Sequence, residues 1–251
     1  MIWFLLLTLI SCSSHKGELK KQQKEFYYKD VSGEFHINRE VRMSTHQVVL
    51  KQEMYRPQDG SKILEKIISV SDAGEVKVNG KQVPLLRPNI SHYTSWLDGK
   101  KFFSQIRFDT KSRSLVVTAQ SPEEKYNGTK RYSLPKGIYF CFFSQLPECI
   151  RASGYFDQLK KNSNTKMNMT VIWDSFPFHE EQFSDIGSSP LQNAKIYFDE
   201  ETNDAFRLGV EVAGQVVFYH FTKHNQFIKM FWIAQGISML PPEEYQPDNE
   251  E

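Results

Sequence analysis

Alternation of apolar and polar residues with a period of two is the feature that most constrains the fold of this sequence. From Phe206 to Val212 every second residue is apolar, and Arg, Gly and Glu hold the positions between them. The segment from Phe35 to Met43 repeats the pattern, with Arg39 as the exception. Successive side chains of a strand point to opposite faces, so the pattern predicts strands with one buried face. Further strand candidates span residues 48–55, 63–70, 100–109, 114–120, 166–174, 194–199, 215–222 and 226–233.

Turn residues predict how these strands connect. The dipeptides Asn79-Gly80 and Asp98-Gly99 are typical of two-residue hairpin loops, whose central residues often adopt positive φ. Residues 134–164 contain two prolines and two cysteines and have the weakest strand pattern, which predicts one or two short helices there. We therefore expect a mainly β fold: a large antiparallel, curved sheet or open barrel with one or two short helices in the middle.

A single β-rich domain is expected over residues 26–240. Residues 106–112 and 196–202 share the pattern I-x-F-D-x-x-[ST], so two similar β halves joined near residues 134–164 are an alternative. Reuse of turn residues by unrelated hairpins also explains this echo. Residues 241–251 contain three prolines and five acidic residues, which predicts a disordered acidic tail.

The N-terminus is an apolar run, residues 1–11, that breaks at Ser11. A membrane-spanning helix needs about 20 residues, so this run has the length of a signal-peptide hydrophobic region instead. Its end, Leu9-Ile10-Ser11-Cys12, resembles the lipobox of bacterial lipoproteins, although no Lys or Arg precedes the run. The resemblance implies removal of residues 1–11 and lipidation of Cys12. A chance cysteine after an apolar N-terminus is the alternative.

The lipoprotein resemblance also implies where the protein works. Cys12 would carry a covalent diacylglycerol and an N-acyl chain, and no other cofactor is expected. Two or three acyl chains hold a protein firmly to a membrane, at about 0.8 kcal/mol per buried methylene. Residues 12–25 are mostly polar and predict a lipidated tether. Ser13 stands where Asp favours inner-membrane retention in enteric lipoproteins, which implies the outer membrane, facing the periplasm.

The remaining cysteines, Cys141 and Cys149, form an even pair if Cys12 carries lipid. In an oxidising compartment a bond between them would close a short loop and stabilise the fold by about 2–3 kcal/mol. Two buried thiols are the alternative. No His lies within ten residues of either cysteine, so no metal site is expected.

Charge and motifs give no support for nucleic-acid binding or catalysis. The chain has 31 Lys and Arg against 30 Asp and Glu, without the basic stripe that a nucleic-acid partner requires. It contains no G-x-S-x-G elbow and no glycine-rich phosphate loop. An enzyme would have to bring acids and bases together from distant strands.

Aromatic residues make up 14% of the chain and point to a function in binding. Residues 216–221 and 227–233 are apolar on both strand faces, which predicts either a two-sided core or the lining of an apolar cavity. The candidate lining residues are Phe218, Tyr219, Phe221, Phe231 and Trp232.

These patterns lead to two expected functions. The first is a non-catalytic envelope lipoprotein that binds lipid or another apolar ligand in a β-sheet groove. The second is a structural or accessory lipoprotein of an envelope protein complex, with no small-molecule ligand. At the level of pattern, the β, helix, β order resembles uncharacterised periplasmic β proteins and the open-barrel carriers and receptors that move lipoproteins to the outer membrane.

Overall fold

The computed structural model describes the backbone of residues 20–29 and residues 35–56, 62–78, 80–137, 139–178, 189–202 and 204–241. Cys12, the signal segment 1–11, the start of the expected tether and tail residues 242–251 lie outside the described residues. The same holds for Asn79 of the first expected hairpin.

Strands dominate the described chain, and two short helices lie in its middle. The strands are β1 (Lys20–Lys29), β2 (Phe35–Met43), β3 (Gln47–Tyr55), β4 (Ile63–Val78), β5 (Lys81–Leu97), β6 (Lys100–Asp109), β7 (Ser114–Gln120), β8 (Gly128–Ser133), β9 (Phe140–Phe142), β10 (Lys166–Ile172), β11 (Leu191–Glu201), β12 (Ala205–Val212), β13 (Gln215–Thr222), β14 (Phe227–Trp232) and β15 (Ile237–Leu240). The helices are α1 (Leu146–Ala152) and α2 (Tyr155–Leu159), with 3-10 turns η2 (Glu124–Tyr126), η3 (Phe143–Gln145) and η5 (Ile233–Gln235).

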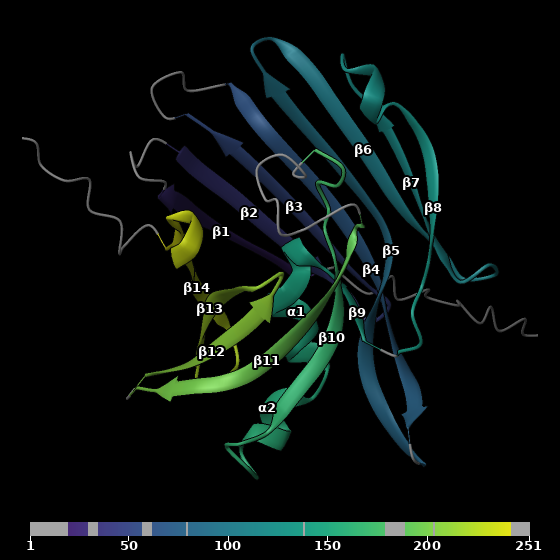
Figure 1. Ribbon diagram of the computed structural model, residues 1–251. Coiled ribbons are helices and arrows are strands. Elements are labelled where there is room, and N and C mark those ends of the chain that lie inside the picture. Colours follow the sequence, from purple (N-terminus) through teal and green to yellow (C-terminus); the bar gives the residue numbers. More distant parts are fainter. Residues whose placement is uncertain are drawn as a thin grey trace, which may run out of the picture.

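All fifteen strands of the described residues belong to one curved sheet with the order β8-β7-β6-β5-β4-β3-β2-β1-β15-β14-β13-β12-β11-β10-β9. The N-terminal half, β1 to β8, is a continuous antiparallel meander, and the C-terminal half, β9 to β15, meets it where β1 pairs with β15. Figure 1 shows the sheet curling around α1, which lies between the two halves. The expected mainly β, curved antiparallel fold with short central helices is confirmed.

One strand pair departs from the antiparallel pattern. β9 and β10 are parallel, with η3, α1 and α2 between them in the chain. Parallel neighbours need a long crossover connection, and a helix usually supplies it. The helices expected within residues 134–164 are therefore this crossover.

Strand β5 was not among the strands expected from the sequence, and it contains prolines at 84 and 88, which are unusual in a central strand. The structure shows why they are tolerated. β5 pairs with β6 only from Ile90 onward, so Pro84 and Pro88 lie where β4 is the sole neighbour. Proline is compatible with such an edge position because no partner needs its missing N–H.

The last residues of the expected tether, residues 12–25, lie in strand β1. β1 begins at Lys20 and pairs with β2 from Lys20↔Met43 to Tyr28↔Phe35. Polar composition did not prevent a strand, because the backbone ladders to β2 and β15 stabilise β1 independently of how apolar its residues are.

The β5–β6 connection confirms the second hairpin prediction. Asp98 and Gly99 have φ of 50° and 73°, and Leu97 pairs with Lys100. Positive φ at both central residues matches the right-handed twist of the flanking strands.

A single buried apolar cluster takes side chains from both halves, from Leu50 and Ile106 to Val210 and Phe221. Its centre is the concave face of the sheet, against which α1 and α2 pack. Because the two halves share this cluster, neither has a separate core of its own among the described residues.

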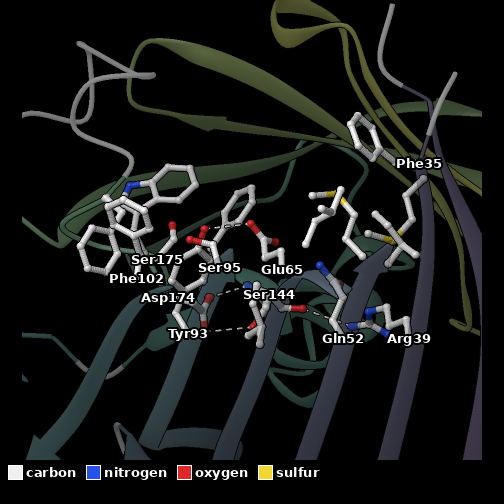
Figure 2. A pocket seen from close by; sticks show the side chains of 18 of the residues that line it. Phe35, Arg39, Gln52, Glu65, Tyr93, Ser95, Phe102, Ser144, Asp174 and Ser175 are labelled. Carbon is white, nitrogen blue, oxygen red and sulfur yellow. Dashed lines mark hydrogen bonds between the residues drawn. The ribbon is translucent and has the colours of Figure 1, made fainter. Parts of the chain in front are cut away.

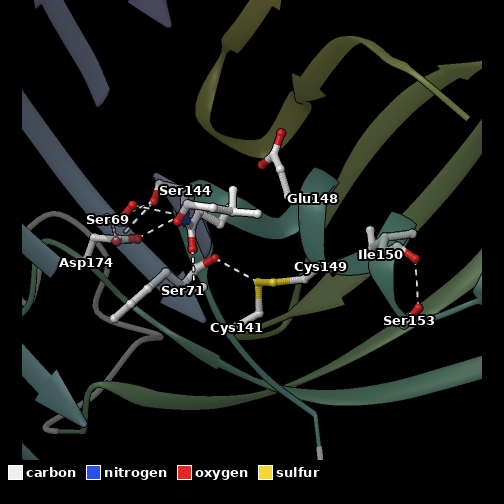
Figure 3. Close-up of a disulfide and its surroundings, with 12 residues drawn as sticks. Ser69, Ser71, Cys141, Ser144, Glu148, Cys149, Ile150, Ser153 and Asp174 are labelled. Atoms are coloured by element: carbon white, nitrogen blue, oxygen red, sulfur yellow. Dashed lines mark hydrogen bonds between the residues drawn. A yellow bond between two sulfur atoms is a disulfide. The ribbon is translucent and has the colours of Figure 1, made fainter. Parts of the chain in front are cut away.

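Cys141 on β9 and Cys149 on α1 form a disulfide, and both are buried. Figure 3 shows the bond beside the polar residues Ser69 and Asp174. It attaches the short strand β9 directly to the helix that fills the curve of the sheet.

Candidate functional site

A cavity of about 540 Å³ lies on the concave side of the sheet. Ligand sites typically enclose about 300–1,000 Å³ and are mainly apolar with a few polar groups. The apolar lining side chains are Phe35, Ile37, Met54, Leu64, Ile67, Trp96, Leu97, Phe102, Tyr126, Phe143, Pro147, Trp173, Phe178, Tyr219, Phe227, Met230, Trp232 and Met239. The polar or charged ones include Arg39, Gln52, Arg56, Glu65, Tyr93, Ser95, Glu123, Ser144, Asp174 and Ser175.

Strand register explains how β2 to β6 build one wall of this cavity. Directly paired, inward-facing residues form a first row across the five strands: Ile37, Met54, Glu65, Ser95 and Phe102. A second row, two residues further along each strand, is Arg39, Gln52, Ile67, Tyr93 and Ser104. All of the first row and most of the second line the cavity.

A third row, two residues beyond the second row on each strand, forms the floor of the cavity. It consists of Val41, Leu50, Ser69, Ser91 and Ile106, all of them buried. The two serines let η3 and the segment around Asp174 approach the sheet closely, because a serine side chain fills little space.

Asp174 forms the centre of the buried polar network at this floor. Its carboxylate accepts hydrogen bonds from the hydroxyls of Ser69, Ser91 (2.8 Å) and Ser144 (3.0 Å), and from the Ser144 backbone N–H (2.9 Å). Burial raises the pKa of Asp174, although these hydrogen bonds act in the opposite direction. The carboxyl group is well satisfied by the protein itself, which indicates a structural role.

Arg39 carries the only charge on the inward face of β2, and α1 compensates for it. Its guanidinium donates to Glu148 Oε2 at 2.7 Å and to the Ser144 carbonyl oxygen at 3.2 Å, and it lies over the ring of Phe227. Both side chains of the ion pair are almost completely buried. The exception in the β2 alternation is therefore the residue that ties the sheet to α1.

Glu65 is partly buried and differs from the buried Arg39 and Asp174 because, among the described residues, its carboxyl group has a single hydrogen-bond donor. Tyr93 Oη donates to Glu65 Oε2 at 3.0 Å, and no ion pair joins Glu65 to any residue that the structure describes. Burial, with the nearby Asp174 adding to it, raises the pKa of Glu65 from 4.5 to about 7. Figure 2 shows Glu65 between Arg39 and Phe35 on one side and Phe102 and Ser175 on the other.

Aromatic side chains gather on the β5–β6 side of Glu65. Phe178 stacks on Tyr93 (6.2 Å between centroids) and meets the rings of Phe102 (5.5 Å) and Tyr126 (5.6 Å) edge to face. All four rings line the cavity. We refer to Tyr93, Phe102, Tyr126 and Phe178 as the aromatic cluster.

A second group of rings lies toward the C-terminal half. The ring of Trp173 stacks on that of Trp232, with 5.9 Å between the ring centroids, and the centroids of Trp173 and Phe143 are 4.2 Å apart. Trp173 Nε1 is buried and has no hydrogen-bond partner among the described residues. An unsatisfied buried donor costs about 1–3 kcal/mol, so this N–H would gain from an acceptor supplied by a ligand.

The five residues that the sequence predicted to line a cavity lie in three different places: the cavity wall, the core and the outer face of the sheet. Tyr219 and Trp232 line the cavity. Phe221 points to the same face as Tyr219 but is fully buried against Phe156 and Phe227, so it belongs to the core. Phe218 and Phe231 point to the opposite, outer face, where they are paired across β13 and β14.

Sequence reasoning did not find Glu65, Tyr93 or Asp174. In β4 Ser69 and Ser71 are buried on the inward side while Ile68 and Val70 are only partly buried, so the buried face of this strand is not its apolar one there. The isolated Glu65 carried no signal of its own, because its importance depends on strands that pair with β4 from other parts of the chain.

Within the described ranges, no group of three or more His, Cys, Asp or Glu side chains is placed to hold a metal ion. None of the helices described is both long and apolar enough to cross a membrane. Comparison with known proteins found no matching family model, no matching curated protein and no matching solved structure.

Proposed function

We propose that this protein is an exported envelope lipoprotein that binds a lipid or another apolar ligand in the cavity of its curved sheet, without catalysing a reaction. The observation that carries the proposal is the cavity itself, about 540 Å³ with a wall made mainly of aromatic and aliphatic side chains and methionines. Burial of apolar ligand surface there would contribute about 25 cal/mol per Å².

The composition of the wall favours a flexible, chain-like ligand. Met54, Met230 and Met239 line it, and the unbranched methionine side chain adapts to irregular shapes. The polar groups of the wall do not form a nucleophile and base. The Ser144 hydroxyl lies within hydrogen-bond distance of the Asp174 carboxylate and the Ser69 hydroxyl, and no histidine is among the described lining residues. This arrangement supports reversible binding.

Filling the cavity tests the proposal. Trp at position 54 would occupy part of the cavity, so Met54→Trp should weaken binding of dansyl-labelled undecanoic acid by at least about tenfold. Val49→Trp is the matched control, since Val49 lies on the same strand with its side chain on the outer face. Energy transfer from Trp96, Trp173 and Trp232 to the dansyl group reports binding inside the cavity.

Native mass spectrometry of protein extracted from its own cells identifies the ligand. Co-purification of a lipid with the wild type and its loss from Met54→Trp would support the proposal. If no lipid co-purifies and the probe binds both tryptophan variants equally, the carrier function is wrong. Co-purification of protein partners alone would favour the accessory function.

The proposed anchor needs its own experiment. Metabolic labelling with a clickable fatty acid should modify the wild type and leave Cys12→Ala unlabelled. Fractionation of the labelled protein then tests attachment to the outer membrane. Equal labelling of both forms would exclude Cys12 as the site of lipidation.

A further inference from the structure

The cavity wall contains a carboxyl group, Glu65, that has no counter-ion among the residues that the structure describes. Glu65 lies in the first row, flanked by Met54 and Ser95, and only the Tyr93 hydroxyl bonds to it among the described residues. A carboxylate in apolar surroundings is costly unless it is paired. A ligand that supplies the missing positive charge would remove this cost.

The other charged residues that line the cavity are Arg39, Arg56, Asp174 and Glu123, and Glu123 forms an ion pair with Lys125. On β2, the Arg39 charge is neutralised by Glu148. Arg56, after β3, is exposed and lies over the Phe35 ring at the β2 end. On the opposite side, Asp174 is a second carboxyl group and raises the pKa of Glu65 further. The remaining neighbours on β3 and β5 are the uncharged Gln52, Tyr93 and Ser95.

The aromatic cluster provides the second feature that a cation recognises. An organic cation is attracted to the faces of aromatic rings within about 6 Å, and desolvated sites gain most. Tyr93 belongs to the cluster and also holds Glu65, while Phe102 is in the same row as Glu65. Carboxylate and rings therefore lie at one place on the wall, next to the apolar space.

We infer that the cavity selects an amphiphile with a cationic amine or quaternary ammonium head, which Glu65 and the aromatic cluster bind while the apolar tail fills the remaining space. The inference rests on the proposed lipid-binding function and adds the class of head group. Trp173 Nε1 is a buried donor in the same wall with no partner among the described residues, and it is available to an acceptor elsewhere on such a ligand.

Three amphiphiles with the same tail test the inference: decyltrimethylammonium, decanol and decanoate. Each is titrated calorimetrically below the concentration at which it forms micelles or reaches its solubility limit. We expect the cation to bind at least about tenfold more tightly than the other two. Decyltrimethylammonium has no ionisable proton, so any proton released on binding at neutral pH comes from the protein. A bound cation favours the ionised form of Glu65 and would therefore release its proton. Titration in two buffers of different ionisation enthalpy measures that release without any variant.

Glu65→Gln should abolish both the preference for the cation and the proton release. Glu75→Gln, on an exposed position of the same strand, is the matched control and should change neither. Equal affinity for the three amphiphiles, tighter binding of decanoate or absence of proton release would overturn this inference and leave the lipid-binding function standing. Failure of all three to bind, together with equal probe binding by Met54→Trp and Val49→Trp, would overturn both.

Discussion

At the scale of single residues, Arg39 shows how a break in a pattern can carry structural information. It occupies an inward position of β2 at 5% exposure, where the alternation requires an apolar side chain. Its guanidinium donates hydrogen bonds to Glu148 on α1 and to the Ser144 carbonyl oxygen on η3. The ion pair therefore specifies where α1 sits on the sheet, a role that a hydrophobic contact would perform less selectively.

Glu148→Gln should lower the free energy of unfolding by about 3–5 kcal/mol, because it leaves a buried guanidinium without its counter-charge. Urea denaturation followed by tryptophan fluorescence measures the loss. The double variant Arg39→Met, Glu148→Leu removes both charges and should recover most of the stability. A loss below about 1 kcal/mol in the single variant would contradict a buried, uncompensated charge.

Glu65 should make stability depend on pH. Its pKa in the folded protein is about 7 against an ordinary 4.5, so the folded state binds more protons than the unfolded state between these values. Stability from this group is complete below about pH 4.5 and is lost as the pH rises through about 7.

We therefore expect wild type to lose about 1–3 kcal/mol of stability between about pH 5 and pH 8 relative to Glu65→Gln. Urea unfolding of both proteins across that range gives the difference. Asp174 is present in both proteins, so the difference reports Glu65 together with its interaction with Asp174. Parallel pH profiles would show that Glu65 is ordinarily solvated.

At the scale of elements, β9 depends on its connections. It has three residues, pairs with one neighbour, β10, and ends the sheet. The Cys141–Cys149 bond joins this strand to α1 over a separation of eight residues. A short edge strand held in this way is protected from pairing with another chain.

Replacing both cysteines with alanine should cost about 2–3 kcal/mol of unfolding free energy, as expected for a short closed loop. Denaturation of the variant under non-reducing conditions measures this. Wild type in excess dithiothreitol should lose a similar amount, whereas the variant should not respond to the reductant. An effect of dithiothreitol on the variant would point to a cause other than this bond.

At the scale of the whole molecule, β1 connects the two halves of the sheet. It pairs with β2 along its length and with β15 from Tyr27↔Leu240 to Lys29↔Ser238. The pairing of β1 with β15, which we call the seam, joins segments that are more than 200 residues apart in sequence. The two halves that meet at the seam also share one buried core.

Tyr28→Pro tests the seam, because proline removes a backbone donor in a strand that has partners on both sides. We expect a loss of about 3 kcal/mol or more, with a single transition for both halves. Thr110→Pro, at an exposed position of the β6–β7 turn, is the control and should change stability little. Separate transitions for the two halves in Tyr28→Pro would show that each can fold without the other.

The local sequence pattern predicted most strands and one hairpin, but it did not predict most of the residues that line the cavity. Alternation placed strands such as β12 and β13 within a residue of their observed bounds, and Asp98-Gly99 identified a hairpin. Strand β5 was missed, and the sequence does not show that its pairing with β6 stops at Ile90, before Pro88 and Pro84. Of the five expected lining residues, only Tyr219 and Trp232 reach the cavity.

The sequence by itself determined the strands, the turns and the β class, because these depend on side-chain periodicity and on φ preferences within a few residues. The lipobox resemblance at Cys12 is likewise a local feature and remains a prediction. Only the tertiary structure decided which strand faces look inward, that Arg39 meets Glu148, and that Glu65 enters an aromatic cavity. Those outcomes depend on the register between strands and on the curvature of the whole sheet, which no local pattern encodes.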